Sequence, residues 1–126
     1  MEHTIIGYIP QLLAYLPVTV EYVVASLLFG SLFAVLLLVM KLAGPAPLRW
    51  IAEFVTTLGR CCPTIIMLFL VYYGLPPVMY SLTGVDIEGY DPIYFVVVSF
   101  SFFLGGSLSE VARSAYLSID AGQFEA

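Results

Sequence analysis

The sequence predicts an all-α membrane protein with three transmembrane helices, and its composition is the first reason. Hydrophobic residues make up 61% of the chain, charged residues only 10%, and the mean hydropathy is +1.01. A soluble domain needs far more charged residues to cover its surface. In a bilayer every backbone polar group must be paired within its own segment. The long apolar runs lack the alternation of barrel strands, so we expect them to form helices.

Three stretches are apolar and long enough to cross the hydrocarbon core, which takes about 20 helical residues. The expected spans cover about 20–42, 62–80 and 92–118. The first contains Gly30 and Ser31, small residues of the kind that let helices approach closely in lipid.

Prolines, glycines and an aspartate mark the expected ends of the second and third spans. Pro63 is expected to open the second span, because a first-turn proline lacks only an N–H that would be unpaired there anyway. Gly74 and the pair Pro76-Pro77 are expected to end or break that helix. Asp91-Pro92 predicts a capped start for the third span.

The distribution of charge predicts an orientation. Cytoplasmic connections of membrane proteins carry an excess of Lys and Arg, whereas the connection before the third span contains only acids. We therefore expect residues 1–17 to form an extracytoplasmic segment with a short interfacial helix, and residues 18–126 to form the transmembrane domain. The bases that place the first connection and the end of the third span in the cytoplasm are Lys41, Arg49, Arg60 and Arg113; the acids of the outer loop are Asp86, Glu88 and Asp91.

A polar stripe on the third span is the candidate functional site. Glu110 and Arg113 are three residues apart, and Gly106 and Ser107 lie one helical turn earlier on the same face. Such a stripe in a membrane faces other helices or water, which suggests a solute path. The alternative is that Arg113 extends to the cytoplasmic surface and Glu110 only neutralises it. For Arg60, close to Pro63, the alternative is an anchor at a helix start.

Several function classes find no support in the sequence. It contains no nucleotide-binding loop, zinc-protease motif or nucleophile elbow, and no basic patch suited to nucleic acid. Cys61 and Cys62 are adjacent, which rarely permits a disulfide, and no Cys/His cluster suggests a metal site. We expect no catalytic residues and no metal.

Two strings resemble a known family. The run from Arg60 through Pro63 to Pro76 is similar to "RGTPLLVQLFLVYYGLP", and the run from Glu110 to Ala126 is similar to "AYxAEVFRGAIxSIPKGQWEAA". Both patterns belong to permease subunits of ABC importers for polar amino acids. Cys61-Cys62 replaces the Gly-Thr of the first pattern. The resemblance covers roughly residues 15–126.

The resemblance implies a type I ABC importer permease bundle of about five spans, of which this chain holds three as the N-terminal portion. It implies a bacterial plasma (inner) membrane protein that works by alternating access and binds no cofactor itself. The implied partners are a second permease subunit, identical or different, an extracytoplasmic solute-binding protein, and an ATPase subunit that binds ATP. It also implies that residues 121–126 begin the coupling helix on that ATPase, through Gly122, Gln123, Glu125 and Ala126.

Two other classes of function compete with transport. A small membrane scaffold or assembly protein, or a truncated permease without function, would use its spans only to pack against partners. A membrane-embedded enzyme would need a cluster of His, Cys or paired carboxylates at one depth, which His3 alone does not supply. Two further apolar spans after Ala126 would distinguish a permease from both.

Overall fold

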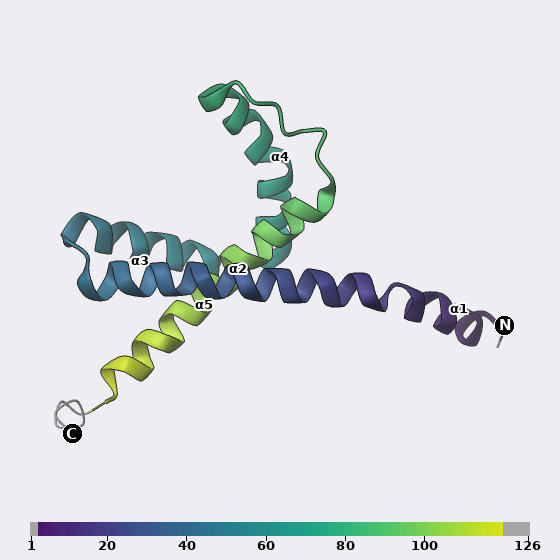
Figure 1. Ribbon diagram of the computed structural model, residues 1–126, viewed down its shortest axis with the longest axis horizontal. Coiled ribbons are helices and arrows are strands. Elements are labelled where there is room, and N and C mark those ends of the chain that lie inside the picture. The colour runs from purple at the N-terminus through teal and green to yellow at the C-terminus, as the bar shows by residue number, and fades with distance from the viewer. Residues whose placement is uncertain (1–2, 120–126) are drawn as a thin grey trace.

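The computed structural model describes residues 3–119, and helices fill most of this range (Figure 1). Among these residues three helices have the length and composition to cross a membrane, as the sequence predicts. Their 28, 20 and 26 residues correspond to about 42, 30 and 39 Å at the α-helical rise. The helices are α1 (His3–Ala14), α2 (Leu16–Ala43), α3 (Ala46–Cys61), α4 (Thr64–Thr83) and α5 (Pro92–Leu117), and the three that can span are α2, α4 and α5.

The first and last long helices, α2 and α5, cross closely at the centre of the molecule (Figure 1). A Cβ added at Gly30 would lie 2.8 Å from the Cβ of Leu104 and 3.3 Å from the carbonyl oxygen of Ser101. Ser101 donates its hydroxyl to the carbonyl oxygen of Ser26 at 3.4 Å, which links the two backbones. The small residue at position 30 therefore permits the close approach that the sequence predicted.

The connection after α2 contains a helix to which the sequence analysis assigned no structure. Gly44 and Pro45 form a short turn, after which α3 runs back beside α2 (Figure 1). Its small residues pack on α5: a Cβ on Gly59 would lie 3.3 Å from the carbonyl oxygen of Phe102, and one on Gly106 would lie 3.3 Å from that of Thr56. The α3 helix therefore fills one side of the α2–α5 crossing.

The expectation that the second span ends or breaks at its prolines is wrong. The α4 helix continues through Pro76 and Pro77 and ends at Gly84, whose φ of 72° is left-handed. The two prolines remove two N–H donors but fit the helical φ, so the chain forgoes two hydrogen bonds without leaving the helix. Gly84 stops it because glycine adopts the left-handed conformation without steric cost, and its N–H bonds to the carbonyl oxygen of Tyr80 at 2.9 Å.

The start of α5 agrees with the sequence pattern, and a short helix precedes the first span. Asp91 caps α5 by accepting a hydrogen bond from the N–H of Ile93 at 3.0 Å, and Pro92 occupies the first turn. The α1 helix is short, contains Pro10 and precedes α2 almost in line (Figure 1). Its location at the outer membrane surface stays a prediction.

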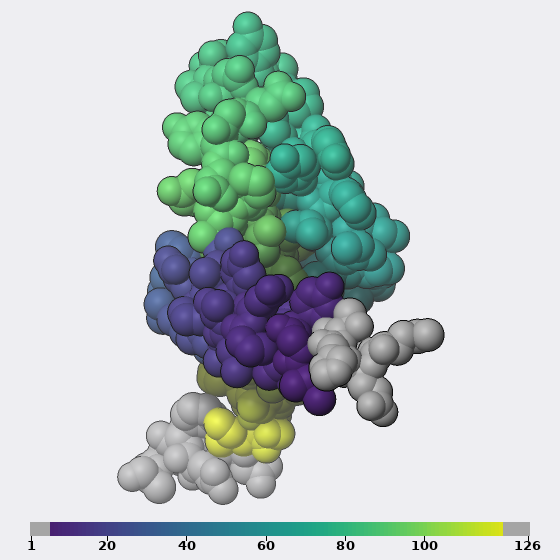
Figure 2. Space-filling view, turned by 90° about the vertical axis from the view of Figure 1, so that its right-hand side faces the viewer, coloured from purple at the N-terminus to yellow at the C-terminus, as the bar shows by residue number. Residues whose placement is uncertain are grey.

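The molecule has two well-separated ends. In the space-filling view, α4 and the loop that follows it project at one end, and the last turns of α5 lie at the other (Figure 2). The expected coupling segment, residues 121–126, follows α5 and lies outside the described residues.

The close approach at Gly30 predicts a specific loss of stability. Gly30→Ala should lower the free energy of unfolding by about 1–3 kcal/mol, because the new methyl group meets the backbone of α5. Gly74→Ala is the matched control, since nothing lies within 4 Å of a Cβ there. Unfolding in detergent micelles, followed by circular dichroism, measures both variants. Equal stability of the two variants would contradict this account of the crossing.

Candidate functional site

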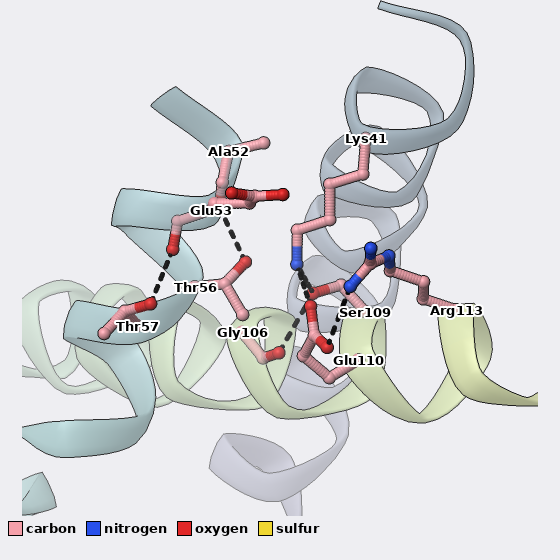
Figure 3. A network of polar contacts seen from close by, with 9 residues as sticks. All are labelled: Lys41, Ala52, Glu53, Thr56, Thr57, Gly106, Ser109, Glu110 and Arg113. Carbon is pink, nitrogen blue, oxygen red and sulfur yellow. Dashed lines mark hydrogen bonds and ion pairs between the residues drawn. The ribbon is translucent and has the colours of Figure 1, made fainter. Parts of the chain in front are cut away.

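A buried lysine from the first span meets the polar stripe of the third (Figure 3). Lys41, in the last turn of α2, forms an ion pair with Oε1 of Glu110 and donates to Oγ of Ser109 at 3.4 Å. The Lys41 side chain is only 1% exposed, and that of Glu110 is 24% exposed. The partner that holds Glu110 most closely therefore belongs to another helix.

The pair that the sequence predicted within α5 is also present. Nη1 of Arg113 lies 3.8 Å from Oε2 of Glu110, at the spacing of three residues. The Arg113 side chain is 38% exposed, which places this contact at the edge of the cluster rather than inside it. Glu110 thus uses one carboxylate oxygen for Lys41 and the other for Arg113, so both cations share one acid.

The serine that contacts this cluster is not the one singled out from the sequence. Ser109 is fully buried, accepts from Lys41 and donates to the carbonyl oxygen of Gly106 at 2.9 Å. Ser107 is half-buried on the same helix. Ser109 lies next to Glu110 in sequence but still reaches the lysine, because Lys41 approaches α5 from above both residues (Figure 3).

Local packing explains why a charged side chain can lie this deep. The long apolar stem of Lys41 runs along α2, and its ammonium group reaches α5 only because the helices are close. Within residues 3–119, every buried side-chain nitrogen and oxygen has a hydrogen-bond partner. An isolated charge in a nonpolar interior costs several kcal/mol, so the ion pair and Ser109 are what make Lys41 tolerable there.

Arg60 and Pro63 lie at the junction of α3 and α4. Arg60 is in the last turn of α3 and is exposed. Pro63 immediately precedes α4 and accepts from the N–H groups of Ile66 and Met67 at 3.0 and 3.1 Å. Among the described residues, the ion pairs of Glu110 join it to Lys41 of α2 and Arg113 of α5, and Arg60 is not one of these partners.

Sequence reasoning missed Lys41 as a member of this site and used it only to orient the chain. One signal was available: Lys41 interrupts an apolar run, and Leu42 and Ala43 follow it before the turn at Gly44. A lone base within an apolar span needs an acid in another helix, and Glu110 is the acid placed deepest in an expected span. Among the described residues no His, Cys, Asp and Glu groups gather as a metal site would require.

No protein-family model matches this chain, but individual proteins do. It is 32% identical over 119 residues to the L-cystine transport system permease protein TcyL of Bacillus subtilis, covering 94% of this chain and 49% of that protein. It is 35% identical over 121 residues to the arginine transport system permease protein ArtQ of Bacillus subtilis, covering 96% of this chain and 52% of that one. The glutamate/aspartate import permease protein GltK of Escherichia coli is 28% identical over 123 residues, 98% of this chain and 55% of its own length.

A solved structure has the same fold. The crystal structure of an amino acid ABC transporter with histidines matches 97% of this chain with a TM-score of 0.77, at 20% sequence identity and over 53% of that chain. The fold is thus that of the matched transporter chain. The chain belongs to the family of amino acid ABC transporter permeases. It spans about half the length of the curated relatives it matches.

The ion pair predicts an asymmetry between its two partners. Glu110→Gln should lower the free energy of unfolding by about 3 kcal/mol, because it leaves the buried ammonium of Lys41 without its acid. Lys41→Met should cost clearly less, since Glu110 keeps Arg113 and is partly exposed. The double variant should recover most of the loss, as an apolar replacement of a buried pair often does.

Unfolding in detergent micelles measures all three variants against the parent chain. Arg113→Met is the matched control, because it removes a cation from the same carboxylate at the exposed edge and should have little effect. A double variant no more stable than Glu110→Gln would show that Lys41 and Glu110 do not act as a pair.

Proposed function

We propose that this chain forms part of the solute path of an ABC importer permease that moves a small polar solute, an amino acid, across the bacterial plasma membrane. The observation that carries the proposal is similarity to amino-acid transport permeases over nearly the whole chain. The polar face of α5 supports it, because charged and hydroxyl groups at membrane depth are costly unless they line a path or hold helices together.

In this proposal the chain performs no covalent chemistry and binds no cofactor. A solute-binding protein delivers the solute to the outer face, a second permease subunit encloses the path, and ATP acts on a separate ATPase subunit. Ser107, Glu110 and Arg113 line the inner part of the path. Lys41 holds Glu110 in place through an ion pair between α2 and α5. The charge that the cluster presents to a solute therefore depends on how these two helices are arranged. Alternating access rearranges such contacts between helices.

We also propose that the N-terminus is outside and the end of α5 is cytoplasmic. The bases support this orientation, because Lys41 and Arg49 flank the α2–α3 turn and Arg113 is near the end of α5. The acidic loop between α4 and α5 lies at the opposite end of the molecule from the last turns of α5 (Figure 2).

Single-cysteine labelling tests this orientation. With Cys61 and Cys62 replaced by Ser, a cysteine in place of Glu88 should react with a membrane-impermeant maleimide in intact cells. A cysteine in place of Arg49 should react only after lysis, which makes it the internal control. The reverse labelling pattern would show that the chain has the opposite orientation and would refute the argument from the positive-inside rule.

Solute-stimulated ATP hydrolysis tests the function itself. The complete protein, reconstituted with an ATPase subunit and solute-binding protein from the same source, should hydrolyse ATP faster when an amino acid is added. Glu125→Lys should abolish the stimulation, because it reverses a charge in the expected coupling segment, while Glu53→Lys on α3 should not. A scaffold or a non-functional fragment would assemble without any stimulation, and that result would refute the proposal.

A further inference from the structure

The outer end of the molecule contains a groove that the proposed path does not yet use. It has a volume of about 620 Å³, within the range of small-molecule sites. A second cavity of similar size between α2 and α5 is lined mostly by apolar side chains. The outer groove differs because aromatic rings and carboxylates share it; its lining includes Tyr72, Tyr73, Tyr80, Asp86, Glu88 and Phe95.

The aromatic wall of the groove is held by contacts between rings. Tyr72 meets Tyr73 edge to face, with ring centroids 4.9 Å apart, and meets Phe95 of α5 in the same way at 5.3 Å. Phe95 is only 4% exposed and anchors this cluster to the third span. Tyr73 is 68% exposed on this chain, so its ring lies at the surface of the groove while the rings beside it are packed.

The carboxylates of the groove have no cation of their own. Asp86 accepts the N–H of Glu88 at 2.9 Å, which orders the loop, and neither carboxylate forms an ion pair within residues 3–119. No Lys or Arg occurs between Arg60 and Arg113 in the sequence. The α4 helix ends beside the groove, and the C-terminal end of a helix carries partial negative charge.

We propose that this groove binds the cationic side chain of the transported solute, so that the preferred substrates are amino acids with an ammonium or guanidinium side chain. The inference rests on the proposed function for the statement that the ligand is transported. A cation gains both from the faces of tyrosine rings and from carboxylate oxygens. A neutral amino acid would bring no net positive charge to two acids without a base, and an acidic amino acid would bring a net negative charge.

Binding of radiolabelled L-arginine to the complete chain in detergent micelles tests the inference, with L-citrulline as its uncharged isostere. Arginine should bind at least about tenfold more tightly than citrulline, the factor expected for loss of one partly desolvated charge. Replacing Asp86 with Asn and Glu88 with Gln together should weaken arginine binding about tenfold. Asp91→Asn is the control, because it removes a carboxylate charge from the same loop at a residue that does not line the groove. Asparagine at this position still caps α5.

The tyrosines give a second readout that is independent of charge. Tyr73→Phe keeps the aromatic face and should bind arginine as the parent does, whereas Tyr73→Leu should bind several-fold more weakly. Equal binding of citrulline and arginine would overturn the inference. Equal losses for the loop acids inside and outside the groove would also overturn it, because they would indicate diffuse attraction.

The inference and the proposed function fail in different ways. A reconstituted complex whose ATP hydrolysis responds equally to neutral, acidic and basic amino acids would overturn the inference and leave the function intact. A complex that no solute stimulates, in which the chain still binds arginine through Asp86 and Glu88, would refute transport while confirming the cation site itself.

Discussion

The close crossing of α2 and α5 is the constraint on which the rest of the structure depends. Helices in lipid gain little from burying apolar surface against one another, so their association relies on packing and interhelical hydrogen bonds. At Gly30 the absence of a side chain brings the backbones close enough for Ser101 to donate to the carbonyl oxygen of Ser26. Gly105 performs the same role one turn further on, where it lies against the ring of Phe33. These residues fix where the two helices touch.

The position of the buried ion pair follows from that crossing. Lys41 lies three turns beyond Gly30 on α2, and Glu110 lies beyond Gly105 on α5, so the charges meet only if the crossing holds its register. On the remaining side of the crossing, α3 packs through Thr56. The Thr56 hydroxyl donates to the carbonyl oxygen of Ala52 in the same helix at 2.7 Å. Its hydroxyl is therefore satisfied without a partner from another helix, as lipid requires. The ion pair therefore depends on the way in which the helix backbones pack.

The sequence reveals helices better than it reveals their partners. The spans and the cap at Asp91 were predictable because apolar run length and local hydrogen bonding decide them. The continuation of α4 through Pro76 was not, since a proline stops a helix only where the chain has a better alternative. Within the site, the contact of Arg113 with Glu110 followed from their spacing on one helix. The closer contact with Lys41 joins residues 69 positions apart, and only the tertiary arrangement supplies it.

Charge is separated along the molecule, and this separation relates the inner cluster to the outer groove. The inner cluster holds two cations, Lys41 and Arg113, on the single acid Glu110, whereas the groove holds acids without a base. In the proposed path, a cationic solute is attracted at the outer end and repelled by the excess positive charge of the inner cluster. In a single static arrangement such a molecule would enter and stop. Under the proposed function, passage therefore requires that the inner positive charge be reduced or displaced for part of the cycle, and a rearrangement of α2 against α5 would do this because it would change the contacts of Glu110 with Lys41 and Arg113.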